Sequence, residues 1–143
     1  MRITQEADYA VRIVDCLARS GGRLDARTLS ETTGVTLRFT LKILRKLLIN
    51  GIVISFKGVQ GGYELAKKPA DINMRQVIEA VDGPIAISRC LSDELSCSFS
   101  ERECRCYYHG VFAEVSKSIK DKFESINFEV KSSDGKEICS HKG

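Results

Sequence analysis

The chain has 143 residues, 43% of them hydrophobic and 29% charged, a balance typical of one globular domain or of a small domain with a helical extension. No apolar run approaches the roughly 18 residues of a membrane span, and the charged residues at the start do not form a signal peptide, so we expect a cytoplasmic protein that does not bind a membrane. The net charge is only +3, but residues 1–68 carry 12 Lys and Arg against 6 Asp and Glu, whereas residues 69–143 carry 10 against 13. This asymmetry indicates that the first half faces a polyanion, with ordinary scatter of surface charge as the alternative.

Apolar residues recur at helical spacing between residues 5 and 19, which predicts a largely buried first helix that ends at Gly21-Gly22. The opposite face carries acidic and basic side chains four residues apart. Asp8 is therefore expected to form an ion pair with Arg12. Cys16 falls within the apolar stripe and is expected to be a core thiol.

Two further helices follow, separated by a glycine. Asp25 can cap a short helix over residues 26–33, Gly34 breaks it, and a second helix is expected over residues 36–50. Two helices joined by a tight turn, the second of them basic on one side, are typical of a helix-turn-helix unit, although basic amphipathic helices also occur on ordinary surfaces. The residues of this second helix that we expect to face inward are Leu37, Leu41, Ile43, Leu44, Leu47 and Leu48.

A β-hairpin is expected directly after this helix. Residues 52–56 and 63–66 have the composition of strands, and the glycine-rich residues 57–62 form the turn between them. A hairpin after a recognition helix is a wing, whose glycines allow close approach to a phosphate backbone and whose Lys57 adds positive charge. A nucleotide-binding loop is not expected, because no helix begins after these glycines.

Two more helices complete the expected structure. Asn73 and Gln76 predict a capping box for a helix over residues 74–82. A long helix is expected over residues 110–127, with a narrow apolar stripe that suits pairing with a second subunit; packing against its own domain is the alternative. The polar residues 131–143 are expected to form a disordered tail. The stripe consists of Val111, Phe112, Val115, Ile119, Phe123 and Ile126.

Between these two helices lies a polar loop with four of the six cysteines and one of the two histidines. Thiolates are soft, anionic ligands, and an irregular loop allows several of them to converge on one iron-sulfur cluster or zinc ion, which the spacing alone does not distinguish. A disulfide framework and thiols without a role are the alternatives. The pattern Cys-x6-Cys-x6-Cys-x-Cys-x2-His is formed by Cys90, Cys97, Cys104, Cys106 and His109.

Five stretches together resemble the iron-sulfur winged-helix transcription regulators typified by IscR and NsrR, over about residues 1–130. They are the opening MRIT and DYAVR, the Leu-x-x-x-Gly-Ile-Val of residues 47–53, the wing KGVQGGYEL, the helix VIEAVDG and the cysteine loop. The wing in that family more often reads Arg-Gly-x-Gly-Gly-Gly, so Lys57 and Gln60 depart from it. The loop departs as well, since the family usually has three cysteines there.

The resemblance implies a set of cluster ligands. In the family the third cysteine is followed three residues later by a possible ligand and six residues later by a bulky aromatic, and Cys106, His109 and Phe112 match this spacing. The fourth ligand is then His109, which we favour for its proximity, or Asp8, which matches an aspartate near the start of the nitric-oxide sensors. The implied ligands are Cys90, Cys97 and Cys106, with Cys104 as a spare and His109 or Asp8 as the fourth.

We therefore expect a mainly α fold with a small β wing: a winged helix-turn-helix DNA-binding domain (1–83), a cysteine-rich cluster loop (84–109), a long dimerisation helix (110–130) and a polar tail (131–143). The resemblance implies a homodimeric repressor of transcription whose affinity for a double-stranded DNA operator is controlled by a two-iron or four-iron cluster that senses cluster supply, redox state or nitric oxide. The alternative is a cluster-free or zinc-stabilised regulator of cysteine or sulfur metabolism.

The sequence offers no nucleophile-base pair, so neither an enzyme nor a small-molecule substrate is expected. The expected DNA contacts are Thr36, Arg38, Phe39, Thr40, Lys42, Lys57 and Gln60.

Overall fold

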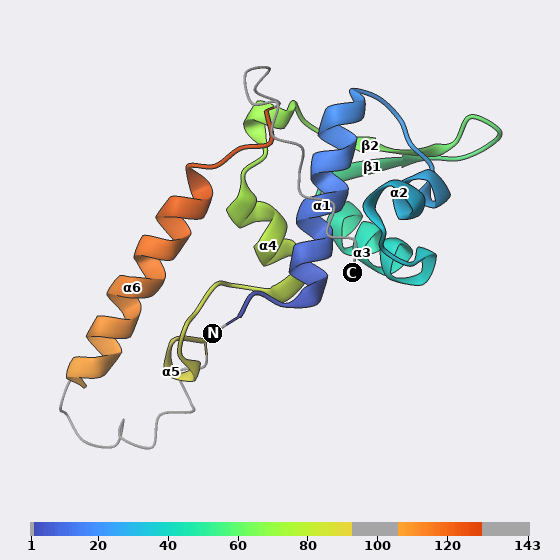
Figure 1. Ribbon diagram of the computed structural model, residues 1–143. Helices are drawn as coiled ribbons and strands as arrows, with labels where there is room; N and C mark the ends of the chain where they lie inside the picture. Colours follow the sequence, from blue (N-terminus) through green and yellow to red (C-terminus); the bar gives the residue numbers. More distant parts are fainter. Residues whose placement is uncertain (1, 93–105, 130–143) are drawn as a thin grey trace.

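The computed structural model describes residues 2–92 and 106–129. Helix α1 (Gln5–Ser20) runs through the middle of the N-terminal part of the chain, and the elements up to α4 are arranged around it (Figure 1). It begins at Thr4, whose hydroxyl accepts a hydrogen bond from the backbone N–H of Ala7 at 3.1 Å, and it ends at Gly21, whose φ of +64° favours glycine. The expected first helix is confirmed. Its buried residues are Ala7, Ala10, Ile13, Val14, Leu17 and Ala18.

The helix-turn-helix unit is also confirmed. Helices α2 (Ala26–Thr33) and α3 (Leu37–Ile49) pack against α1 and against each other, and the chain turns between them at Gly34. Asp25 caps α2 and Thr36 caps α3 through their side-chain oxygens. The largest wholly buried side chains of the resulting core include Ile13, Leu17, Leu29, Ile43, Leu44 and Leu47.

A two-stranded antiparallel sheet follows α3 and projects from the helices as a wing (Figure 1). Strand β1 (Val53–Phe56) pairs with β2 (Gly62–Leu65), which confirms the expected hairpin. Leu24 ties β2 to the segment before α2, because it exchanges two backbone hydrogen bonds with Tyr63 at 2.7 and 2.9 Å. The opposed pairs are Val53 and Leu65, Ile54 and Glu64, Ser55 and Tyr63, and Phe56 and Gly62.

A 3-10 turn, η1 (Pro69–Asp71), leads into α4 (Met74–Asp82), which packs on α1 and α3. The side chain of Asn73 accepts a hydrogen bond from the N–H of Gln76 at 2.9 Å, and the side chain of Gln76 accepts one from the N–H of Asn73 at 3.1 Å. The expected capping box is therefore confirmed. A short helix, α5 (Arg89–Ser92), follows.

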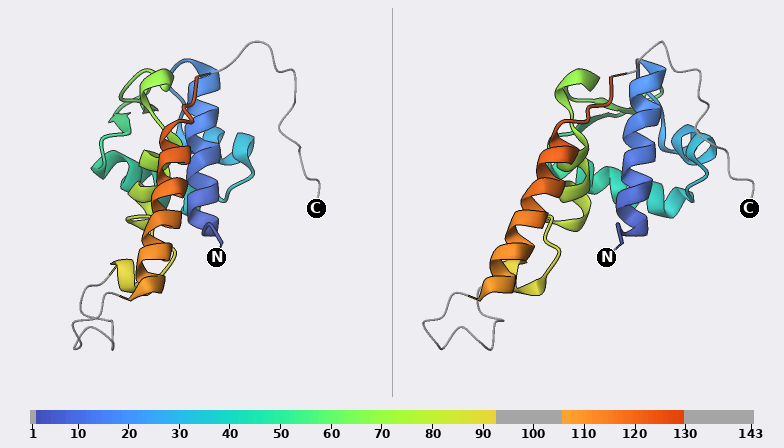
Figure 2. Two further views of the ribbon diagram at one scale, coloured as in Figure 1. Left: turned by 90° about the vertical axis from the view of Figure 1, so that its left-hand side faces the viewer. Right: turned by 60° about the vertical axis from the view of Figure 1, so that its left-hand side comes forward.

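Helix α6 (Tyr107–Glu124) packs against α4 and α5 and lies on the side of the molecule away from the wing (Figures 1 and 2). It begins and ends three residues earlier than the expected span of 110–127, so those boundaries are wrong. Cys106 already provides the N-cap, and the chain leaves the helix at Ser125. None of the helices in the described parts of the chain is long and apolar enough to cross a membrane.

After α6 the chain returns to the winged-helix core. The N–H of Met74 donates to the carbonyl of Ile126 at 2.8 Å, and the N–H of Phe128 donates to the carbonyl of Pro69 at 3.1 Å. The side chain of Phe128 is buried in the core cluster. The helical pattern of the sequence places Ile126 on the long helix and does not predict that Phe128 is buried. The pattern continues beyond Glu124, where tertiary contacts end the helix.

The apolar stripe of α6 divides between two environments. Phe123 is half-buried, and Ser116 is buried and accepts a hydrogen bond from the N–H of Ile87 at 3.2 Å. Phe112 and Val115, in contrast, are 39% and 43% exposed. Helix α6 therefore packs partly on its own domain, as the alternative predicts, and it leaves an apolar strip uncovered within the described chain.

Candidate functional site

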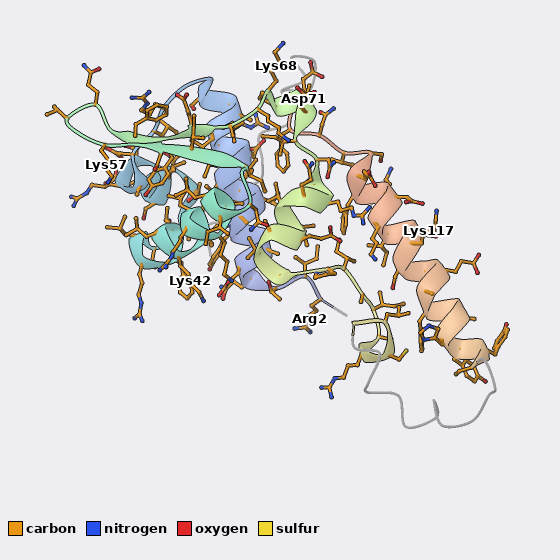
Figure 3. The ribbon with its side chains drawn as sticks, turned by 180° about the vertical axis from the view of Figure 1, so that it is seen from behind. Arg2, Lys42, Lys57, Lys68, Asp71 and Lys117 are labelled. Atoms are coloured by element: carbon orange, nitrogen blue, oxygen red, sulfur yellow. The ribbon has the colours of Figure 1, made fainter. Side chains whose placement is uncertain are left out.

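The solvent-exposed face of α3 is basic, as the sequence predicts. Arg38, Lys42 and Arg45 are all exposed along it. Figure 3 shows Lys42 and the wing residue Lys57 on the side of the molecule away from α6, which carries Lys117. Helix and wing therefore present positive charge together, as in proteins that place a helix in the major groove and a wing against phosphates.

Two expectations about α3 are wrong. Thr40, expected to reach base edges, is wholly buried, and its hydroxyl donates to the carbonyl of Val35 at 3.4 Å. Leu37 and Leu41, expected to face inward, are 39% and 45% exposed. The reason is that the rest of the domain covers only one face of the helix, and the two leucines lie beside that face. The covered face consists of Thr40, Ile43, Leu44 and Leu47.

Two other predicted contacts also have structural roles. The hydroxyl of Thr36 accepts a hydrogen bond from the N–H of Phe39 at 3.4 Å and so caps α3. The ring of Phe39 meets the ring of Tyr9 edge to face, with 6.1 Å between the centroids, and remains 40% exposed. Both residues lie at the N-terminal end of α3, the end that contacts base edges in helix-turn-helix proteins.

Lys42 and Lys46 of α3 share one acidic partner from another helix. Glu6 of α1 accepts hydrogen bonds from Lys42 and from Lys46, the latter at 2.7 Å. These bonds, that from Lys42 first, lower the pKa of Glu6, so its carboxylate stays ionised at neutral pH. Glu6 therefore holds a negative charge beside a lysine that is expected to contact DNA.

Glu6→Gln is expected to strengthen binding to operator DNA by up to about fivefold, since an exposed ion pair contributes roughly 0.2–1 kcal/mol. The released lysine should also make the affinity depend more steeply on salt. Titration of a fluorescent duplex at several salt concentrations measures both quantities. Asp71→Asn is the control, because it makes the same change in net charge at the 3-10 turn, away from Lys42 (Figure 3). Equal strengthening by both variants would contradict a local competition between Glu6 and phosphate.

The wing turn is held by an arginine that sequence analysis does not single out. The guanidinium of Arg23 lies over the ring of Phe56, 3.3 Å from its centroid, and donates to the carbonyl of Gln60 at 3.0 Å. It also lies 3.7 Å from the carboxylate of Glu64. Lys57 and the side chain of Gln60 are exposed at the turn. The only sequence signal for Arg23 is its position after a glycine pair, and its role follows from the pairing of Leu24 with the wing.

Gly62, the first residue of β2 after the wing turn, leaves no room for a side chain. Its φ is +151°, and a Cβ would lie 2.7 Å from the carbonyl oxygen of Leu24 and 2.9 Å from the carbonyl carbon. Gly62→Ala is expected to lower the free energy of unfolding by about 2–3 kcal/mol, because the pairing between Leu24 and Tyr63 must open to relieve the clash. Chemical denaturation followed by circular dichroism measures this. Gly22→Ala is the control, since a Cβ there meets no heavy atom within 4 Å. Equal stability of the two variants would show that the backbone around Gly62 rearranges without loss of stability.

The described ends of the cysteine loop lie at the same end of the molecule (Figure 1). Cys106 is the exposed N-cap of α6, and its side chain makes no capping hydrogen bond. His109 is exposed in the first turn of α6, three residues beyond Cys106. Cys90 is half-buried in α5, with its Sγ 3.1 Å from the hydroxyl of Ser88. Helix α5 packs against α6, and three predicted ligands therefore lie on two contacting helices at one end of the molecule (Figure 1).

Two predicted ligands, Cys97 and Cys104, lie outside the described residues. Among residues 2–92 and 106–129, no three Cys, His, Asp or Glu side chains gather closely enough to hold a metal ion. The donors at the α5–α6 junction are two thiols and an imidazole, and this chemistry fits an iron-sulfur cluster or a zinc ion. The loop that joins the two helices carries the two further thiols.

Asp8 is engaged away from this junction. Its carboxylate pairs with the guanidinium of Arg12 at 2.9 Å, as the four-residue spacing predicts. It also borders a shallow surface cavity between α1 and the start of α4, lined in part by Ile3, Thr4 and Met74. In the part of the chain that the structure describes, Asp8 joins no group of metal-binding side chains.

The Rrf2 family, described as an iron-dependent transcriptional regulator, matches residues 3–130. An Rrf2-like HTH-type transcriptional regulator of Rhodobacter capsulatus is 34% identical over 134 residues, which cover 89% of each chain. The HTH-type transcriptional regulator IscR of Pectobacterium atrosepticum is 32% identical over 131 residues, which cover 90% of this chain and 77% of the relative.

Solved structures share the fold. IscR of T. potens superposes with a TM-score of 0.67 and 25% identity, over 90% of this chain and 83% of its own. CymR, described as the global cysteine regulator of B. subtilis, superposes with a TM-score of 0.73 and 20% identity, over 90% of this chain and 94% of its own. These relatives are transcriptional regulators and not enzymes, in agreement with the sequence analysis. The chain belongs to the Rrf2 family of winged-helix transcriptional regulators.

Proposed function

We propose that this chain is a homodimeric repressor whose affinity for a DNA operator is controlled by an iron-sulfur cluster. The observation that carries this proposal is that Cys90 lies in α5 and that Cys106 and His109 lie at the start of α6, which packs against α5 and also bears the uncovered apolar strip. The description of the family as iron-dependent and the 32% identity with an IscR support it. The proposed ligands are Cys90, Cys97, Cys106 and His109, with Asp8 as the alternative fourth ligand and Cys104 as a spare.

The proposed division of labour follows the chain. Residues 1–83 bind DNA, 84–109 hold the cluster, 110–130 form the dimer contact, and 131–143 are a polar tail outside the described residues. In a dimer, the two copies of α3 would enter successive major grooves on one side of the duplex, about 34 Å apart. Small changes in the separation of these helices would then cost base contacts in one or both half-sites.

Contacts through α4 connect the proposed dimer helix to the recognition helix. Arg75 of α4 donates to the carboxylate of Glu124 in α6 at 2.9 Å. At the other end of α4, the carbonyl of Val81 accepts a hydrogen bond from Lys46 of α3 at 3.2 Å. A bound cluster would supply a redox-active centre that links α5 to α6. The residues of α4 would pass a shift of that junction to α3, which supports control of DNA affinity by the cluster loop.

The test is anaerobic purification of the full chain, followed by an absorption spectrum and analysis of iron, sulfide and zinc. We expect a coloured protein with stoichiometric iron and sulfide, whose operator affinity changes when the cluster is removed. A colourless protein that contains zinc, or no metal, would favour the alternative of a zinc-stabilised or cluster-free regulator of cysteine or sulfur metabolism. The fold shared with CymR, described as a cysteine regulator, is the observation on the side of that alternative.

His109→Ala is expected to give a cluster with a shifted absorption spectrum and a shorter lifetime in air, because the imidazole lies one helical turn from Cys106. Asp8→Ala should change the spectrum little, since its carboxylate is paired with Arg12 at 2.9 Å. Anaerobic spectra before and after timed exposure to air measure both effects. A normal spectrum in His109→Ala with a perturbed one in Asp8→Ala would instead assign the fourth ligand to the first helix.

A further inference from the structure

The recognition helix carries two leucines that the core does not use. Leu37 and Leu41 are one helical turn apart on the same side of α3, and they are 39% and 45% exposed. They lie in the N-terminal half of the helix, the half that contacts base edges in helix-turn-helix proteins. Ile49, at the C-terminal end of the same helix, is 75% exposed but lies outside that half.

Basic side chains stand beside the leucines. Arg38 lies between them in sequence, and Lys42 and Arg45 continue the exposed face along the next turns. This combination suits a duplex better than a protein partner, because the cations match the phosphate backbone while the leucines, between the basic face and the buried face of α3, offer apolar surface next to them. Phe39 is a less suitable base reader, since its ring is already packed edge to face against Tyr9.

Leucine has no hydrogen-bonding group, and this limits what it can contact in the major groove. Guanine, adenine and cytosine present donors and acceptors there, whereas thymine adds an apolar C5-methyl group. A leucine against a donor or acceptor would remove it from water without a partner, which is unfavourable. A leucine against the methyl group buries apolar surface on both sides.

We propose that Leu37 and Leu41 form an apolar reading surface for the C5-methyl groups of thymines in each half-site of the operator. The inference rests on the proposed function only in that α3 enters the major groove; it does not depend on the cluster. In this proposal the two leucines determine sequence specificity, and the neighbouring arginines and lysine provide affinity for the DNA backbone.

The test begins with selection of an operator from a random duplex library by the full-length protein. Each thymine of the half-site is then replaced by deoxyuridine, which removes only the methyl group. We expect at least one position per half-site at which the replacement weakens binding by about fourfold, the effect of one buried methyl group. Replacing that T·A pair by C·G should weaken binding, and 5-methylcytosine at the same position should restore part of the loss.

Four variants locate the effect. Leu41→Ala or Leu37→Ala should bind the thymine and deoxyuridine operators equally at the affected position. Ile49→Ala, the matched exposed apolar control, should keep the fourfold difference. Arg38→Ala should weaken binding to both operators and preserve their ratio.

The proposal is overturned if no deoxyuridine replacement affects a specific, salt-dependent complex. It is also overturned if Leu37→Ala and Leu41→Ala each weaken binding to the thymine and deoxyuridine operators by the same factor, so that the wild-type ratio between the two is kept. Either result leaves DNA binding by α3 intact. Failure to select any specific duplex would overturn the DNA-binding role itself, together with this reading surface.

Discussion

Val115→Glu is expected to convert the proposed dimer into monomers. Val115 is 43% exposed on α6, so the substitution should leave the fold of a single chain unchanged. In a two-fold interface each subunit would place a new carboxylate in an apolar seam, and an unpaired buried charge costs about 3–5 kcal/mol. Light scattering should then report the chain mass of 15.9 kDa, and operator affinity should fall steeply because the two half-site contacts are no longer linked.

Lys117→Gln provides the matched control for this experiment. It makes the same change of one unit in net charge two residues further along α6, and its side chain is 77% exposed and paired with Asp121 at 2.8 Å. Residues two apart do not share a helix face, so this variant should remain dimeric and bind DNA as the wild type does. A Val115→Glu protein of twice the chain mass would rule out the apolar strip as the dimer contact.

The elements that the sequence predicts well are those with local signals. The capping box of Asn73 and Gln76 and the glycine turn at Gly34 depend on neighbouring residues, and both have the expected form. The same holds for the first helix and the hairpin, where apolar periodicity and glycines lie within a few residues of each other. The winged helix could therefore be predicted from short stretches alone.

The errors arise where distant segments decide the outcome. Thr40 is buried and Leu41 is exposed because the rest of the domain covers one particular face of α3, and the apolar pattern of the helix alone does not define that face. Phe128 is buried because residues 126–128 return to the 3-10 turn, which a helical pattern cannot indicate. In both cases tertiary packing overrides the local pattern.

The candidate site shows the same division. Arg38 and Lys57 can be named from the sequence, since basic residues on a recognition helix and at a wing tip have a local signature. Arg23 and Glu6 cannot, because each acts through a partner more than 30 residues away: Arg23 on the carbonyl of Gln60, and Glu6 on Lys42. Arg23 holds the wing turn and Glu6 pairs with Lys42, and both contacts can be seen only in the structure.

Cys106→Ala is expected to abolish the proposed cluster while leaving the protein folded. Cys106 stands at an N-cap, where serine, threonine, asparagine or aspartate usually accept a hydrogen bond from the helix. Its side chain makes no such bond and is exposed, so the fold does not depend on its thiol. The partial positive charge at a helix N-terminus also favours an anionic ligand at this position.

Cys16→Ala is the control for loss of a thiol. Cys16 is half-buried against the core, and burial raises the pKa of its thiol, which keeps it neutral and unsuited to bind a metal. Iron, sulfide and the visible spectrum should therefore be lost from Cys106→Ala and kept in Cys16→Ala, with similar circular dichroism for both. Operator affinity of Cys106→Ala should equal that of the cluster-free wild type. If Cys106→Ala retains iron and sulfide at the wild-type level, Cys104 must supply the third thiolate, and the Cys-x2-His pairing with His109 no longer identifies the ligands.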